Sequence, residues 1–308
     1  MSVVAGCSLL DGVILGADCR VTYKDARGSL TYRDTVQKVI AITPRNAIGF
    51  VGDVTTASDL IGSMLKNCHS MERYNPVTLR NWLPRYFRHR YAHFNGAREV
   101  TFLVGSVIHD RPNIVETRRA WQVVQDSFAS RPQGSINHLS SNLYHILSLR
   151  TPYVVLPDQP MGMLYTMRSP AFIPSHYHPL DFVAIGSGHE MEHFIGQVSD
   201  QIFSGAPMQH GDASWLTRSM NHFLRTKNIE SVGGMFPMIK LSKTGAMHIT
   251  RQTGRIPHGP LYELAHENDR WVQRNVTTGE EMRLELPWEL DQTIRDDQRF
   301  DDLRPSTI

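Results

Sequence analysis

The chain has 308 residues, enough for one large domain or two small ones, and 41% of them are apolar, so a full hydrophobic core is expected and disorder is not. The formal net charge of +2 argues neither for nor against nucleic acid, and no apolar run is long enough to span a membrane. Cys7, Cys19 and Cys68 show no disulfide or metal-binding spacing, which suits a cytoplasmic protein.

The first two predicted strands form a hairpin that ends in charged residues. Segments rich in β-forming residues lie on either side of Asp11-Gly12, a dipeptide that favours a two-residue hairpin turn. The second strand covers residues 13–17, and Asp18 and Arg20 follow it. Because a sheet holds the ends of its strands rigidly, these two residues are candidates for a catalytic site.

Two further strands are predicted between Lys38 and Asp53. One apolar run, residues 39–42, begins directly after Lys38, and another, residues 47–51, ends at Gly52-Asp53. A basic residue and a glycine turn therefore also lie at strand ends. The first 53 residues thus place a hydroxyl group (Ser2), an acid (Asp18), a base (Lys38) and a glycine turn (Gly52) at the ends of predicted strands.

Two helices are predicted next. Residues 54–67 repeat apolar side chains at helical spacing, with Asp53 or Thr55 available as the N-cap. Residues 78–93 show a second helical pattern in which arginines alternate with aromatic residues, and Pro84 marks a start or a kink within it. This mixture is also typical of nucleic-acid-binding surfaces. We interpret it instead as a solvated helix face above buried aromatic side chains, and we expect no nucleic-acid partner.

The rest of the chain alternates strands and helices around an inserted segment. An apolar run at residues 100–108 predicts a strand, and residues 110–160 are interpreted as an insertion from one edge of the core. The later predicted elements are strands at 163–167 and 182–185, helices at about 188–203 and 213–224, and a hairpin of strands 235–242 and 246–250. After residue 255 the chain is polar and charged.

Residues 2–59 resemble the start of the β subunits of the proteasome and their bacterial relatives, including HslV, which are N-terminal nucleophile (Ntn) hydrolases. The resemblance returns at residues 182–188 and 232–234. The positions that match catalytic residues of the family are Ser2, Asp18, Arg20, Lys38, Gly52 and Ser187. One segment departs from the family pattern, because residues 228–234 contain no matching Asp, and Glu230 or Ser231 would have to replace it.

The resemblance implies an α+β fold, the four-layer αββα sandwich of the Ntn hydrolases. The fold would occupy residues 2–254 with the insertion at about 110–160, and residues 255–308 would form a polar C-terminal extension. The resemblance also implies a homo-oligomeric ring, with a peptide or amide as the substrate. It implies neither a cofactor nor a metal, and it names no regulatory partner.

The resemblance also assigns a role to each matched residue. Ser2 would be the nucleophile, and its own α-amine, with an ordinary pKa of about 7.7–8.0, would be the base once Met1 is removed. We expect no self-cleavage step, since serine after Met1 suits methionine aminopeptidase. Lys38 would tune the amine and the developing alkoxide by its charge.

Four matched residues would support Ser2 and Lys38. Asp18 would hold Lys38, and Arg20 would brace the same network. The amide of Gly52 would face the oxyanion, a contact worth about 3–4 kcal/mol in comparable sites. Ser187 would lie near the amine of the nucleophile.

The same comparison implies an apolar substrate pocket. Its walls would be Val21, Val36, Phe50 and Val54, with Phe50 as the floor. A charged substrate side chain would lose its hydration there without gaining a partner. We therefore expect a preference for small or medium apolar side chains on the acyl side of the cleaved bond. The alternative is that Phe50 and Val54 are ordinary core residues.

Two other functions remain open from the sequence. The chain could be a catalytically silent scaffold subunit of the same fold. It could also be a zinc hydrolase, because His189-Glu-Met-Glu-His193 satisfies the H-E-x-x-H pattern that places both histidines on one helix face. A zinc site needs a third ligand, and the spacing does not choose between His210 and His222.

Overall fold

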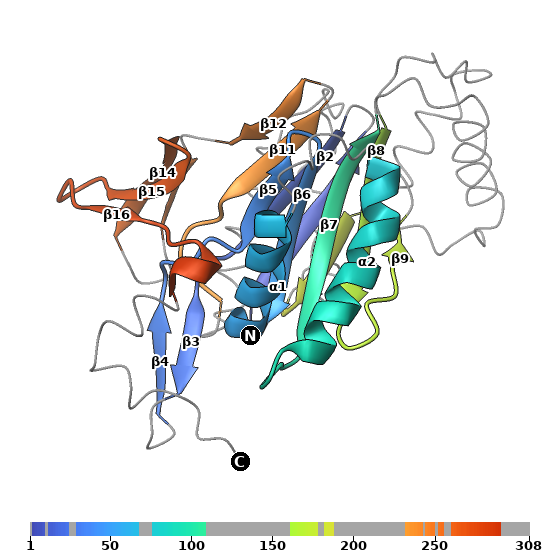
Figure 1. Cartoon of the computed structure of the whole chain (residues 1–308). Helices are drawn as coiled ribbons and strands as arrows, with labels where there is room; N and C mark the ends of the chain where they lie inside the picture. Colours follow the sequence, from blue (N-terminus) through green and yellow to red (C-terminus); the bar gives the residue numbers. More distant parts are fainter. Residues whose placement is uncertain are drawn as a thin grey trace, which may run out of the picture.

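The computed structural model describes residues 2–9, 12–24, 29–67, 76–108, 161–177, 182–187, 232–242, 244–249, 252–255 and 260–290 (Figure 1). Their central feature is a pair of five-stranded sheets. The first sheet has the strand order β10 (Phe182–Gly186), β1 (Val3–Leu9), β2 (Gly12–Ala17), β11 (Met238–Ser242) and β12 (Gly245–His248). All its neighbouring strands are antiparallel.

The second sheet carries the predicted strands that flank Lys38 and Gly52. Its order is β5 (Val39–Thr43), β6 (Asn46–Gly52), β7 (Val100–Ile108), β8 (Met161–Arg168) and β9 (Ser175–His176). Ile108 of β7 is paired directly with Met161 of β8. The interpreted insertion, which itself lies outside the described residues, therefore leaves and rejoins the sheet at two adjacent strand ends.

The two sheets pack face to face through apolar side chains. Val4 and Leu15 of the first sheet belong to the same buried cluster as Leu103 and Leu164 of the second. Gly6 allows the close approach, since a Cβ there would lie 2.9 Å from Leu15 Cδ2 and 3.1 Å from Leu103 Cδ2. This packing fixes the start of β1 against the second sheet.

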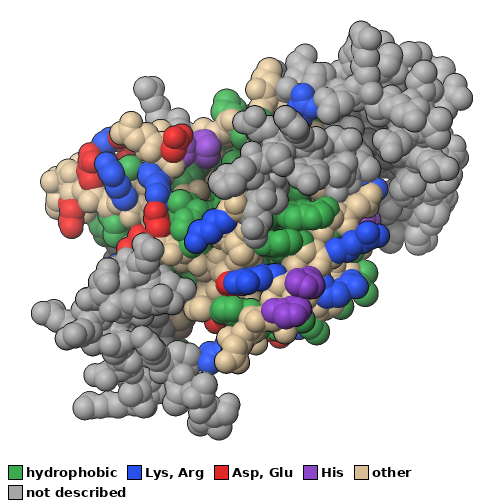
Figure 2. Space-filling model, viewed as in Figure 1, with side chains coloured by type: hydrophobic (Ala, Val, Ile, Leu, Met, Phe, Trp, Pro, Cys, Tyr) green, Lys and Arg blue, Asp and Glu red, His purple; other side chains and the backbone are tan. Residues whose placement is uncertain are grey.

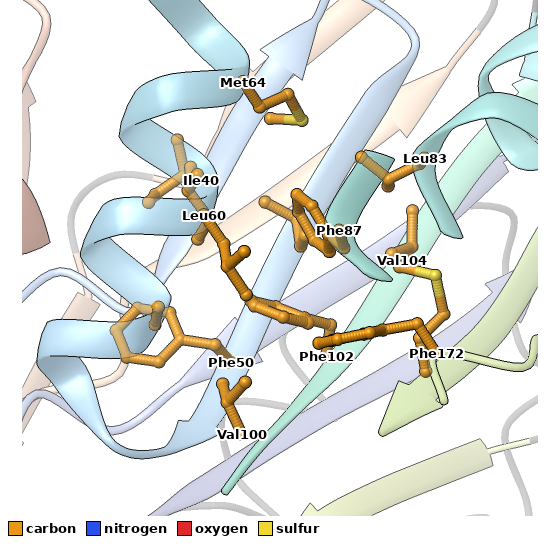
Figure 3. Packing of buried hydrophobic residues seen from close by; sticks show 14 of the residues in the cluster. Ile40, Phe50, Leu60, Met64, Leu83, Phe87, Val100, Phe102, Val104 and Phe172 are labelled. Carbon is orange, nitrogen blue, oxygen red and sulfur yellow. The ribbon is translucent and has the colours of Figure 1, made fainter. Parts of the chain in front are cut away.

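Helices α1 (Val54–Asn67) and α2 (Pro76–His93) cover the other face of the second sheet (Figure 1). A second buried cluster joins them to the sheet, with Leu60 of α1 and Phe87 of α2 packed near Phe102 of β7 (Figure 3). The N-terminus of α1 is capped by Asp53, whose Oδ1 accepts from Thr56 N at 2.7 Å. Both predicted helices are confirmed, with Pro84 inside α2.

The basic side chains of α2 lie on its outer face. Arg85, Arg88 and His89 are exposed, whereas Leu83 and Phe87 are buried, as the interpretation of a solvated face requires. Figure 2 shows Lys, Arg and His side chains side by side on this side of the molecule. No helix among the described residues is both long and apolar enough to cross a membrane.

These layers are compatible with the αββα sandwich of the Ntn hydrolases. The described residues supply a helix pair, a sheet and a second sheet packed on the first. The two helices predicted at about 188–203 and 213–224 lie outside the described residues.

The C-terminal part contains a sheet that the sequence analysis did not predict. It consists of β13 (Gln252–Arg255), β14 (Leu261–Glu267), β15 (Arg270–Asn275) and β16 (Glu281–Arg283), in that order. Leu264, Trp271 and Leu284 from this region form a buried cluster with Cys19 and Met235. This sheet is therefore packed on the core, next to the hairpin of β3 (Val21–Lys24) and β4 (Leu30–Arg33).

Candidate active site

Ser2 lies at the start of β1, beside the end of β10. Ser2 is buried, with only 8% of its surface exposed. The backbone carbonyl of Ser2 accepts from Ser187 N at 2.8 Å. Gly186, at φ 76°, makes this approach possible, because a Cβ there would lie 2.1 Å from Ser2 O. The position of Ser2 is thus set by a glycine turn at the end of the neighbouring strand.

Lys38 points at the Ser2 hydroxyl. Its Nζ donates to Ser2 Oγ at 2.8 Å and to both carboxylate oxygens of Asp18 at 3.0 Å. It also donates to the backbone carbonyl of Arg20. Lys38 is 1% exposed, so an ammonium group is held in the interior with three acceptor residues around it.

Asp18 is fully buried at the end of β2. Besides Lys38, its carboxylate accepts from Val3 N at 2.9 Å, Arg20 N at 3.2 Å and Gly233 N at 3.5 Å. Burial raises the pKa of Asp18, while the nearby Lys38 ammonium and the backbone donors oppose that shift. The hydrogen bonds place the carboxylate between the start of β1 and the ammonium, where it orients Lys38 towards Ser2.

The side chain of Arg20 points to a partner that the sequence analysis did not name. Its guanidinium donates to both carboxylate oxygens of Asp34, at 2.6 and 2.8 Å. Gly233 lies so close that a Cβ there would be 2.3 Å from Arg20 Cζ. Arg20 therefore reaches Lys38 through its backbone carbonyl, and its side chain braces the chain around Asp34.

Gly52 and Ser187 are the two remaining predicted site residues. Gly52 is the exposed last residue of β6, at φ 104°, and a Cβ there would clash with Glu99 O at 2.4 Å. The preceding Val51 lies against Gly186, which links the end of β6 to Ser2. The hydroxyl of Ser187 is buried and has no hydrogen-bond partner among the described residues.

The residues expected to line a pocket come together in the core. Val21, Val36 and Phe50 are buried in one cluster, and Val54 is partly buried against it. Phe50 is 1% exposed and packs near α1 and β7 (Figure 3). This burial favours the alternative that they are core residues.

Two polar residues of the site, the partly buried Asp34 and the buried Gln273, were missed from the sequence. Asp34 binds Arg20, and Gln273 of β15 donates to Asp34 O. A charged residue directly after β4 was a possible signal for Asp34. Gln273 gave none, because its partners Asp34 and Met235 lie 239 and 38 residues away in the chain.

The histidines of the zinc alternative lie outside the described residues. These are His189 and His193, with His210 and His222 as possible third ligands. Glu230 and Ser231, the possible replacements for the missing Asp, also lie outside. In the described part of the chain, no group of three or more His, Cys, Asp or Glu side chains could hold a metal ion.

Comparison with known families agrees with the geometry of this site. Residues 2–130 match the proteasome subunit family. This stretch includes Ser2, Asp18, Lys38 and Gly52, and it confirms the resemblance to proteasome β subunits. A comparison with curated proteins finds no significant match.

Proposed function

We propose that the chain is an Ntn hydrolase that cleaves peptide or amide bonds, with Ser2 as the nucleophile. The observation that carries this proposal is the 2.8 Å contact between Lys38 Nζ and Ser2 Oγ, supported by the buried carboxylate of Asp18. The match to the proteasome subunit family supports the reaction class, although that family also contains inactive members.

The reaction begins when Ser2 Oγ attacks the carbonyl carbon of the substrate. The free α-amine of Ser2 takes the hydroxyl proton and delivers it to the departing amine, leaving an ester between Ser2 and the acyl group. Water then cleaves this ester and restores the hydroxyl. Met1 must be removed for the amine to be free.

The neighbouring groups favour this step electrostatically. The Lys38 ammonium stabilises the negative charge that develops on Ser2 Oγ and disfavours protonation of the adjacent amine. The hydroxyl of Ser187, which lacks a hydrogen-bond partner in the described part of the chain, would gain one in a free α-amine on Ser2. We assign the Gly52 amide to the oxyanion.

Replacing Ser2 by Ala tests the nucleophile directly. Incubation with a β-lactone or an epoxyketone should add one acyl or alkyl group to the wild-type chain, and intact-protein mass reports this addition together with loss of Met1. Ser2→Ala should gain none while keeping its thermal stability. Ser8→Ala is the matched control, since Ser8 is also buried in β1 but donates to Gly162 O.

The result also separates the alternatives. A wild-type chain that folds but is never modified would be a silent scaffold subunit. Activity that chelation abolishes and zinc restores, with His193→Ala inactive, would establish the zinc hydrolase. A homo-oligomeric ring remains a prediction of the family resemblance, and a cytoplasmic location remains a prediction from the cysteine content.

We further propose an apolar preference on the acyl side of the cleaved bond, and Phe50→Ala tests it. Because Phe50 is buried among core side chains, the variant should lose roughly 3–5 kcal/mol of unfolding free energy. A fluorogenic peptide panel then reports selectivity. A shift towards Phe, Tyr and Leu would place Phe50 at the pocket floor. An unchanged ranking would make it a core residue only, and fastest cleavage after a charged residue would contradict the pocket.

A further inference from the structure

The buried amide of Gln273 bridges two segments that build the Ser2 site. Gln273 lies on β15 and is fully buried. Its Nε2 donates to Asp34 O at 2.9 Å, and its Oε1 accepts from Met235 N at 3.3 Å. One side chain from outside the family-matched stretch therefore ties the chain before Lys38 to the loop at 232–235.

The two bridged segments are the ones that hold Asp18 and Arg20. The loop contributes Gly233, whose N–H donates to Asp18 Oδ2 at 3.5 Å and whose carbonyl accepts from Cys19 N at 3.1 Å. The other segment contributes the carboxylate of Asp34 to Arg20. A shift of either segment would move the acceptors that position Lys38 against Ser2.

The C-terminal region also fixes the residues immediately before Lys38. Glu285 forms a parallel β-bridge with Val36, in which Glu285 N donates to Thr35 O at 2.6 Å and Gln37 N donates to Glu285 O at 2.9 Å. Residues 34–37 are thus held by backbone hydrogen bonds and by the Gln273 amide together.

We propose that Gln273 is a positioning residue of the Ser2 site and that the sheet β13–β16 is an integral part of that site. This inference rests on the proposed function. Gln273 acts through Asp34 and Met235, because it makes no hydrogen bond to Ser2, Asp18 or Lys38 in the described part of the chain. Its role needs one donor and one acceptor on the same group, which an amide or a protonated acid supplies and an ionised carboxylate does not.

Gln273→Glu tests this requirement through pH. When ionised, the new side chain keeps the acceptor for Met235 N but faces Asp34 O without a proton. When protonated, it restores both hydrogen bonds. The rate of Ser2 modification by a β-lactone should fall roughly 10- to 100-fold at about pH 8, by analogy with residues that orient the ligands of metal sites. The difference in modification rate between the variant and the wild type should become smaller as the pH is lowered, since burial favours the protonated form of the new Glu.

Asn275→Asp is the matched control. Asn275 is a buried amide on the same strand, and the substitution introduces the same charge. Its Oδ1 accepts from Thr277 N and Thr278 N, which a carboxylate can also do. We expect this variant to react at the wild-type rate over the whole pH range.

A second variant, Gln273→Met, keeps the volume and removes both hydrogen bonds. Its loss of rate should be independent of pH, unlike that of Gln273→Glu. All rates are measured below the melting temperature of each variant. Lower stability with an unchanged rate in the folded variants would overturn the proposal.

The remaining outcomes separate the inference from the proposed function. If the wild type is not modified at Ser2, the proposed function falls and the inference falls with it. If the wild type and both Gln273 variants react alike at every pH, only the inference is wrong. If both Gln273 variants fail to fold while Asn275→Asp folds, Gln273 is a stability residue and the inference is also wrong.

Discussion

Lys38 and Asp18 form a buried ion pair whose presence stability alone does not explain. Removing two charges from water costs several kcal/mol, and well-packed apolar residues often replace such pairs with no loss of stability. Here the side chains of Lys38 and Asp18 are 1% and 0% exposed. The Lys38 ammonium donates to the hydroxyl of Ser2, the residue that would carry the free α-amine. Buried, charge-coupled groups that converge on one nucleophile are typical of active sites.

Gly186 provides a prediction about the placement of Ser2. Gly186→Ala should abolish modification of Ser2 and lower stability, because the new Cβ would lie 2.1 Å from Ser2 O on a backbone with φ 76°. Gly279→Ala is the control, since Gly279 has a similar φ of 72° but nothing within 4 Å of an added Cβ. It should lose a little stability from backbone strain and keep its reactivity. Full reactivity of Gly186→Ala towards a β-lactone would contradict the placement.

At the scale of secondary structure, strand β12 meets the C-terminal sheet through aromatic rings. His248 of β12 stacks on His266 of β14 with ring centroids 3.5 Å apart, and both rings lie edge-on to Trp271. Burial lowers the pKa of both histidines, that of His248 to about 4, and Asp269 opposes the shift. The contact therefore favours neutral rings.

This contact predicts how stability depends on pH. In the unfolded chain a histidine takes up its proton near pH 6.5, whereas folded His248 stays neutral until about pH 4. Between these values the unfolded state binds more protons, so stability falls as the pH drops from about 6.5 towards 4. Melting temperatures measured across this range should fall less steeply for His248→Phe than for the wild type. Equal slopes would show that the stacked pair does not contribute.

Secondary structure was predictable from the sequence where the pattern of apolar residues was periodic. Helix α1 has the predicted bounds, because Leu60, Ile61 and Met64 repeat at helical spacing. The C-terminal sheet was missed because its strands mix apolar and charged residues, and Leu264 is the one buried residue of β14. Their polar composition resembles that of a surface segment.

The candidate site was predictable to the extent that local spacing encodes it. Ser2, Asp18 and Lys38 were found because each lies at a strand end in the order that the family shares. Gln273 was missed because it bonds Asp34, which lies 239 residues away in the chain. Asp34 is only 14 residues from Arg20, but no local sequence pattern pairs the two. The sequence therefore predicted the residues that the structure brings together around Ser2, and it missed two that contact them from other segments.

At the scale of the whole molecule, the sheet β13–β16 belongs to the same folded unit as the core. Trp271 has the largest fully buried side chain among the described residues. It belongs to one buried cluster with Cys19, which follows Asp18, and Met235, which precedes β11. Burial of a tryptophan and its neighbours is a large share of the marginal stability of a domain. We therefore expect one cooperative unfolding transition for the core and this sheet.

Truncation tests this unity of the fold. A chain that ends at Ile249 loses β13–β16, exposes Cys19 and Met235, and leaves Gln37 N without its acceptor. It should be recovered mainly in the insoluble fraction, and any soluble protein should melt at a lower temperature and lack β-lactone modification. A chain that ends at Leu290 keeps all these contacts and is the control, expected to match the full chain in melting and modification. A soluble chain ending at Ile249 that reacts at the full rate would show that the sheet is an independent appendage.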